Sequence, residues 1–181
     1  YVLLAVTSAL GLLLIMWGGW WLIAVGAVIL LGALAYSAGP WPLSRHCFGE
    51  VMVIIFFGIV PVNFTCWLVS GLWSVESLLV SVAVGLMGAN VLIVNNYRDA
   101  DDDAAVGKHT LATRFGRKAM HRLYLANAVV ASSLTLLASC QFIFAAAVYL
   151  TVAYFIWRRM KLPENPEQAY LVALNPLLGM T

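Results

Sequence analysis

Charged residues are scarce in this sequence. Only 10% of its 181 residues are Asp, Glu, Lys or Arg, whereas 63% are hydrophobic. A soluble domain is nearer half apolar and a quarter charged, and a chain of this size cannot bury so large an excess in one core. The composition therefore excludes an ordinary soluble domain and indicates that lipid covers part of the surface.

Cysteine is also scarce. Cys47, Cys66 and Cys140 lie far apart, with no CxxC pair and no Cys/His cluster. This pattern argues against a disulfide framework and against a zinc site. A basic region before the first apolar run is missing too, so that run is not a signal peptide. Both ends of the chain stand inside apolar runs, from which we expect the complete protein to be longer.

Long apolar runs dominate what is present, and they are long enough to span a bilayer, which takes ~20 residues. Backbone polar groups in lipid must be satisfied within each segment, so each run is expected to be a helix. The prediction is an all-α, polytopic transmembrane helix bundle. Its seven segments are Val2 to about Met16, Trp20 to Tyr36, Phe48 to Ser70, Leu78 to about Tyr97, Leu123 to Ser139, Phe142 to Trp157, and one from about Tyr170.

The ten Lys and Arg residues fall in alternate connections between these segments. They are Arg45 in one loop; Arg98, Lys108, Arg114, Arg117, Lys118 and Arg122 in a second; and Arg158, Arg159 and Lys161 in a third. Alternate loops share one side of a membrane, and the positive-inside rule places that side in the cytoplasm. The pattern also supports the segment count, because one miscounted helix would scatter the charges over both sides.

An Asp-rich stretch, Asn95-Asn96-Tyr97-Arg98-Asp99-Ala100-Asp101-Asp102-Asp103, carries the chemistry. Asn95, Asp99 and Asp103 are spaced by four, so they form a column on one face if the preceding helix continues past the membrane surface. Carboxylate and amide oxygens suit Mg²⁺, which is held by one or two carboxylates, waters and substrate phosphates. The stretch is therefore predicted to hold a divalent metal and a diphosphate.

Basic residues that suit a phosphate follow the acidic stretch. Gly107 and Lys108 combine a flexible backbone with a point charge, and Arg98 and Arg114 extend the cationic reach. The competing interpretation is a solvated acidic turn, but four Asp within five residues repel one another unless a cation joins them. A calcium loop and a Walker A motif are excluded by the residues Ala104, Thr110 and His109 at positions where those motifs require others.

A second loop on the same side runs from Tyr36 to Glu50 and is broken by Gly39-Pro40 and Pro42. Arg45 is either a headgroup anchor or a residue of the site. His46 and Glu50 form no HExxH pattern, so a zinc hydrolase is unsupported. Glu50 is either a partner of the helix dipole or a group in the reaction cavity.

These motifs resemble a known family. The residues from Asn95 to Asp99 with Asp103, then Gly107 to Ala112 and Arg114-Phe115-Gly116, resemble the second Asp-rich motif of the UbiA superfamily of intramembrane prenyltransferases. The pattern is most similar to the menaquinone branch, which acts on 1,4-dihydroxy-2-naphthoate. Upstream residues look like the same branch: Tyr36, Gly39-Pro40, Pro42-Leu43, Gly49-Glu50 and Phe56-Phe57-Gly58. The resemblance covers essentially the whole chain.

The resemblance implies an architecture. Family members have nine helices, and the seven segments here would be the third to the ninth of one domain, with residues 1–181 as a partial prenyltransferase domain. The family's first Asp-rich motif would lie before Tyr1, so this fragment alone is not expected to be active. Other branches carry a Tyr-x-x-x-Lys motif at Tyr36, where this chain has Pro40, and Arg45 is a candidate for the missing role.

The resemblance also implies a reaction. A polyprenyl group passes from polyprenyl diphosphate to 1,4-dihydroxy-2-naphthoate with decarboxylation, giving demethylmenaquinone and diphosphate at the bacterial inner membrane. Mg²⁺ would be held by Asn95, Asp99 and Asp103, with Asp99, Asp103 and Lys108 as catalytic residues. The residues expected to bind the diphosphate are Arg98, Lys108, Arg114, Arg45 and Tyr36. The expected partners are these substrates and membrane lipid, with no nucleic acid.

Three rival interpretations stay open at this point. Another aromatic acceptor, such as 4-hydroxybenzoate or homogentisate, is the nearest. A transporter is the second, although transporters place their cation sites near the membrane midplane and this acidic stretch lies at a boundary. A non-catalytic membrane scaffold is the third. The sequence gives neither the prenyl chain length nor the oligomeric state.

Overall fold

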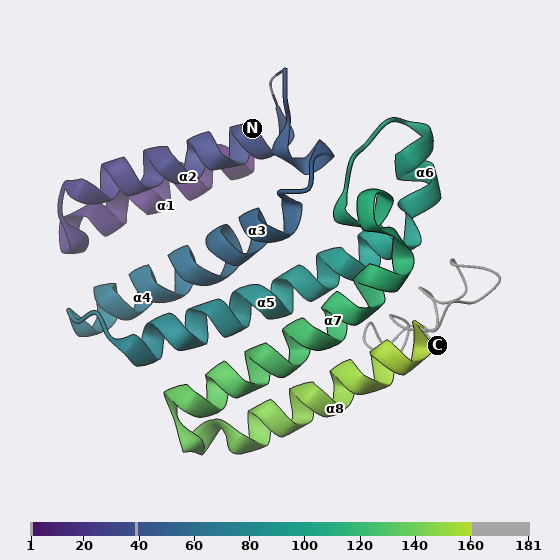
Figure 1. The fold of residues 1–181 in the computed structure, drawn as a ribbon. Helices are drawn as coiled ribbons and strands as arrows, with labels where there is room; N and C mark the ends of the chain where they lie inside the picture. The colour runs from purple at the N-terminus through teal and green to yellow at the C-terminus, as the bar shows by residue number, and fades with distance from the viewer. Residues whose placement is uncertain (1, 39, 161–181) are drawn as a thin grey trace.

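The computed structural model describes residues 2–38 and 40–160, which form helices joined by short connections, with no strand in these two ranges (Figure 1). The prediction of an all-α polytopic transmembrane bundle is confirmed. The elements in chain order are α1 (Val2–Gly18), α2 (Trp21–Ser37), η1 (Leu43–Arg45), α3 (Gly49–Val53), η2 (Ile54–Ile59), α4 (Val60–Ser70), α5 (Val75–Arg98), α6 (Ala100–Ala105), α7 (Leu111–Ala138), η3 (Cys140–Phe142) and α8 (Ile143–Arg159).

All six of the predicted segments that fall within the described residues are helical. The third is built from α3, η2 and α4, which together run from Gly49 to Ser70. Gly49–Ser70, Val75–Arg98 and Cys140–Arg159 are long and apolar enough to cross a membrane, and α2 is a shorter apolar helix. The seventh segment, expected from about Tyr170, lies outside the described residues.

The connections alternate between the two ends of the bundle. Figure 1 shows η1, α6 and the end of α8 at one end, and the turns that join α1 to α2, α4 to α5 and α7 to α8 at the other. We call the first end the charged end, because it carries Arg45, the Asp-rich stretch and Arg158–Arg159. The prediction that the basic loops share one side is confirmed for the described residues. Which side of the membrane they face stays a prediction.

The core lies where α5 packs against α7 and α8. Ile93, Tyr97 and Tyr124 are buried there, together with small residues such as Ala128 and Ala153. Small side chains let membrane helices approach closely. Large apolar side chains elsewhere on α1, α2 and α8 are exposed, including Leu12, Leu31 and Phe144, and this apolar exterior is what a lipid-covered helix bundle requires.

The span from Gly49 to Ser70 is not a uniform α-helix. The π-helical turn η2 ends at Ile59, two residues before Pro61, which has no backbone N–H and whose ring clashes with the preceding turn. A Cβ atom on Gly58 would lie 2.5 Å from the Cα atom of Gly85, and one on Gly85 would lie 2.7 Å from the carbonyl oxygen of Ile54. Only glycine permits this close crossing of η2 and α5.

Helix α7 begins at Leu111, twelve residues before the apolar segment predicted from Leu123. The Thr110 side chain accepts a hydrogen bond from the Thr113 N–H at 3.2 Å and caps the helix. Gly116, with φ of 78°, bends it soon afterwards. Much of the stretch expected as a loop is therefore helical, and its basic residues stand on ordered backbone.

Candidate functional site

The two loops of the charged end are tied together by hydrogen bonds. The backbone N–H of His109 donates to the carbonyl oxygen of Arg45 at 2.8 Å, and the Cys47 thiol donates to the carbonyl oxygen of His109 at 3.4 Å. The loop before α3 therefore lies against the stretch that follows α6. Beside this contact is a hollow of about 570 Å³, lined by Trp41, His46, Cys47, Phe48, His109 and Arg114.

The Asp-rich stretch contains a break in the helix. Helix α5 ends at Arg98, and Asp99, with φ of −85° and ψ of 7°, joins it to the short helix α6. Hydrogen bonds from the Asp99 N–H to Asn95 (3.0 Å) and from the Asp103 N–H to Asp99 (2.8 Å) still cross the junction. Asn95, Asp99 and Asp103 were expected to align on one helix face if α5 continued regularly past the membrane surface. The break at Asp99 means that α5 does not continue in this way.

Asp103 faces the interior of the charged end. It is 8% exposed, and the ammonium nitrogen of Lys108 lies 3.1 Å from each of its carboxylate oxygens. Gly107, with φ of 70°, turns the chain back so that Lys108 can reach Asp103. The Thr113 hydroxyl donates to the Lys108 carbonyl at 3.1 Å and holds that backbone in place. The predicted metal ligand and the predicted diphosphate ligand are thus in direct contact.

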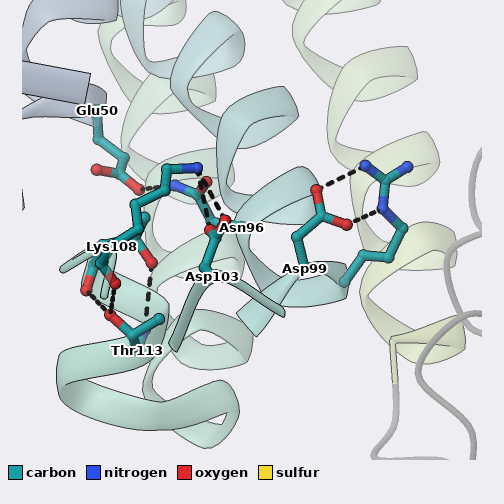
Figure 2. A network of polar contacts seen from close by, with 8 residues as sticks. Glu50, Asn96, Asp99, Asp103, Lys108 and Thr113 are labelled. Atoms are coloured by element: carbon teal, nitrogen blue, oxygen red, sulfur yellow. Dashed lines mark hydrogen bonds and ion pairs between the residues drawn. The ribbon is translucent and has the colours of Figure 1, made fainter. Parts of the chain in front are cut away.

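Asp99 points away from Asp103, as Figure 2 shows. Its carboxylate accepts hydrogen bonds from the Arg98 guanidinium, one of them from Nη2 at 2.6 Å, and about a third of each side chain is exposed. These hydrogen bonds hold the pKa of Asp99 below its usual value of 3.8, against a smaller opposing effect of burial. Asp99 is therefore ionised and already bound to a cation.

Glu50 and Asn96 form a pair that the sequence did not reveal. The amide nitrogen of Asn96 donates to Glu50 Oε1 at 2.9 Å, and the two residues are 6% and 5% exposed. Glu50 stands in the first turn of α3, and Asn96 lies in the last turns of α5. A single Glu at the start of one apolar helix and the Asn residues near the end of another were the available signals, but neither identifies the other as its partner.

Arg117 holds the junction between α5 and α6 against α7. Its Nε atom donates to the carbonyl oxygen of Tyr97 at 2.9 Å, and Nη1 lies 3.1 Å from a carboxylate oxygen of Asp101. The sequence placed Arg117 only among the basic residues of the loop. The structure gives it a supporting role, because it fixes the backbone from which Asp99 and Asp103 project.

The other predicted site residues are more dispersed. Tyr36 is half-buried and lines an apolar groove of about 520 Å³ between α2 and the α3–η2 segment, together with residues such as Gly32 and Phe56. Asn95 is half-buried, whereas Arg45 and Arg114 are exposed. No group of three or more His, Cys, Asp or Glu residues within the described ranges is arranged to hold a metal ion. The roles assigned to Asn95, Asp99, Asp103 and the basic residues stay predictions.

Comparison with known proteins finds matches to one family of prenyltransferases. A model of the UbiA prenyltransferase family matches residues 1–174. The 1,4-dihydroxy-2-naphthoate octaprenyltransferase of Mycobacterium tuberculosis is 39% identical over 132 residues, which are 73% of this chain and 45% of that protein. The protein of the same name in Escherichia coli is 28% identical over 166 residues, 87% of this chain and 51% of that protein.

A relative with a different name also matches. The 2-carboxy-1,4-naphthoquinone phytyltransferase of a Synechocystis species is 31% identical over 94 residues, 52% of this chain and 30% of that protein. The chain spans about half the length of the first two relatives (45% and 51%). No solved structure gives a significant match.

Proposed function

Because the chain belongs to the UbiA prenyltransferase family, we propose that the complete protein transfers a polyprenyl group from polyprenyl diphosphate to 1,4-dihydroxy-2-naphthoate. Loss of the carboxylate as carbon dioxide accompanies the transfer, so that the products are demethylmenaquinol, the reduced form of demethylmenaquinone, carbon dioxide and diphosphate. The match to the family over residues 1–174 carries this proposal, and relatives named for the naphthoate reaction support the acceptor. Residues 1–181 are then part of one prenyltransferase domain.

Family membership disfavours the rival interpretations as a transporter or a scaffold. An aromatic acceptor other than the naphthoate is the alternative that stays within the family. The prenyl donor is left open, because the relatives are named for octaprenyl and phytyl groups. The proposal therefore specifies the class of donor, an allylic diphosphate with a long isoprenoid tail, and not its length.

The residues of the Asp-rich stretch fit Mg²⁺ in their chemistry. Asn95, Asp99 and Asp103 offer oxygen donors only, and Mg²⁺ takes one or two carboxylates while substrate phosphates and waters complete its shell. Asp99 and Asp103 each already bind a cationic side chain, so both carboxylates attract positive charge in this fold. Bound Mg²⁺ would neutralise the negative charge that develops on the departing diphosphate.

Lys108 supplies the second part of the site. In the structure its ammonium group is bound to both oxygens of Asp103. Asp103 would hold the metal, and the Lys108 ammonium group would then be available to a diphosphate oxygen, where its charge would stabilise the leaving group. Arg98, which is paired with Asp99, would have the same role. Arg114 and Arg45 are two further cations of the charged end that the proposal assigns to the diphosphate.

The donor tail follows the apolar groove that begins at Tyr36. This groove is lined almost wholly by apolar side chains and runs from Tyr36 to Ile29 along α2, a distance of about 10 Å at 1.5 Å per residue. A lipid-soluble tail and a charged diphosphate require a site at the edge of the membrane. By the positive-inside rule this edge is the cytoplasmic face of a bacterial inner membrane.

The test uses membranes that contain the full-length protein. Polyprenyl diphosphate, Mg²⁺ and 1,4-dihydroxy-2-naphthoate labelled in its carboxyl group are supplied, and products are identified by mass spectrometry. The expected product is a prenylated naphthoquinol without the label, which leaves as carbon dioxide, and a chelator should stop the reaction. A product that keeps its carboxyl group would contradict decarboxylation. Transfer to 4-hydroxybenzoate but not to the naphthoate would contradict the acceptor.

A further inference from the structure

Glu50 is a carboxylate in a place where a charge is costly. It is 5% exposed, in the first turn of the span that runs from Gly49 to Ser70, and its identified partner is the neutral amide of Asn96 at 2.9 Å. A buried charge in a protein is normally paired with an opposite charge or bound to a metal. A hydrogen bond from an amide orients a carboxylate but does not neutralise it.

The ion pairs of the described residues leave Glu50 uncompensated. They join Arg98 to Asp99, Lys108 to Asp103 and Arg117 to Asp101, and none of the three includes Glu50. The positive end of the helix dipole favours a negative charge at this position. A dipole end carries only about half an elementary charge, so it offsets part of the charge on Glu50 and not the whole.

The surroundings of Glu50 are those of the diphosphate site. Asn96 follows Asn95, and the loop that leads to Glu50 is tied to His109, the neighbour of Lys108. Figure 2 shows Glu50, Asn96, Asp103 and Lys108 gathered on one side and Asp99, which pairs with Arg98, on the other. Two carboxylates and one ammonium group leave this gathering with a net negative charge, which a divalent cation would reverse.

We propose that the Glu50 carboxylate belongs to the Mg²⁺–diphosphate site, as an oxygen donor to the cation beside Asp103, and that Asn96 holds it in position. This inference rests on the proposed function. The sequence predicted metal ligands only in the Asp-rich stretch. The proposal adds a ligand from α3, so that two separate segments of the chain contribute to the site. It also accounts for the contact between the loop before α3 and the stretch after α6.

An isosteric substitution separates this role from a structural one. Glu50→Gln keeps the volume of the side chain and an oxygen that accepts from Asn96, and it removes only the charge. Mn²⁺ serves as the probe, titrated in the presence of inorganic diphosphate into the purified full-length protein, with bound metal followed by electron paramagnetic resonance. We expect Mn²⁺ to bind at least tenfold more weakly to Glu50→Gln, within the range of about 10- to 100-fold known for changes around metal ligands.

Glu76→Gln is the matched control. Glu76 is exposed in the first turn of α5, at the opposite end of the bundle, and its substitution should leave Mn²⁺ affinity unchanged. A purely structural or dipole role for Glu50 predicts a lower melting temperature for Glu50→Gln with unchanged Mn²⁺ affinity, and that result would overturn the inference while the proposed function stands. Failure of the wild-type protein to bind Mn²⁺ or transfer a prenyl group would instead count against the proposed function.

A second isosteric pair covers the case in which Glu50→Gln does not fold. Glu50→Asp and Glu50→Asn have the same shape and differ in charge, so both shorten the reach of the side chain equally. The inference expects the Asp variant to bind Mn²⁺ more tightly than the Asn variant. Equal affinities in this pair would overturn it.

Discussion

The two ends of α5 show opposite uses of polar residues. At its start, the Ser74 hydroxyl accepts from the Ser77 N–H at 3.0 Å, and the Ser77 hydroxyl donates to Asn63 Oδ1 at 3.0 Å. Aromatic rings also lie at this end, where the ring centroids of Phe64 and Trp73 are 5.5 Å apart. At its other end stand Asn96, bound to buried Glu50, and the three ion pairs of the Asp-rich stretch and Arg117.

The difference between these ends lies in what the polar groups accomplish. At the start of α5, Ser74, Ser77 and Asn63 satisfy the backbone of a helix terminus and link two neighbouring helices. These three are neutral, and the charged Glu76 beside them is exposed. At the charged end, three carboxylates are paired with cations, and in the proposed function the diphosphate takes over two of these cations from Asp99 and Asp103. The same helix therefore carries neutral structural contacts at one end and paired charges at the other, and four predictions test that division.

The largest effect is expected from Asp103→Asn. It removes a charge that binds Lys108 and, in the proposed function, Mg²⁺, so prenyl transfer by the full-length protein should fall by about 100-fold or more. Glu76→Gln, at the opposite end, should stay within about twofold of the wild type. Rates are measured in membranes at matched expression. Equal losses in the two variants would show that the ends do not differ in this way.

The second largest effect is expected where η2 crosses α5, between the two ends of that helix. A Cβ atom at position 58 would lie 2.5 Å from Gly85 Cα, so Gly58→Ala should destabilise the protein by about 1–3 kcal/mol, as overpacked cores do. Gly26→Ala is the control, because nothing lies within 4 Å of a Cβ atom there. Thermal unfolding in detergent measures both. An unchanged melting temperature in Gly58→Ala would contradict the close crossing.

A smaller difference in stability is expected between variants of two asparagines, one at each end of α5. Asn96→Leu removes the donor to buried Glu50 and should cost about 1–3 kcal/mol, the cost of an unsatisfied buried group. Asn63→Leu should cost less, under about 1 kcal/mol, because its partner Ser77 is only half-buried and its hydroxyl also lies 2.9 Å from the Ser74 carbonyl oxygen, to which it can donate. Melting temperatures decide the order. The reverse order would mean that the hydrogen bond to Ser77 matters more than the one to Glu50.

The smallest effect is the pH dependence at Asp99. Hydrogen bonds from Arg98 hold the pKa of Asp99 below its usual value of 3.8. A lowered pKa stabilises the folded state above the usual value, and that contribution disappears as the pH falls through the folded value. The difference in melting temperature between wild type and Asp99→Asn should be constant from pH 5 to 8 and shrink below about pH 4. It should correspond to under ~1 kcal/mol, because the pair is partly exposed.

The positions of the helices followed from the sequence because lipid imposes them. A run of apolar residues has no other way to satisfy its backbone in a bilayer, so the segments from Val2 to Trp157 were placed well. The prediction that the basic loops share one end also held, because successive membrane spans run in opposite directions and alternate loops therefore lie on the same side. The early start of α7 was missed, because residues 111–122 are rich in basic side chains and do not form an apolar run. Their helix is capped by Thr110 and held against α5 by Arg117.

The candidate site was only partly predictable, because its contacts join distant stretches. Asp103 and Lys108 lie five residues apart, and the sequence named both as site residues, although not their contact. The pairing of Glu50 with Asn96 joins residues that are 46 positions apart, and no local pattern encodes it. The break at Asp99 was missed because a spacing of four reads as a continuous helix unless the junction is known.

The π-helical turn η2 also sets the rotational phase of the span that contains it. Gly58 and Glu50 both face α5, one against Gly85 and the other against Asn96. Eight residues of regular α-helix would rotate these two positions about 80° apart, and the wider π turn between them takes up part of that angle. Deleting one residue from η2 would therefore keep the span apolar and helical, yet it would turn Glu50 away from Asn96 by about 100°.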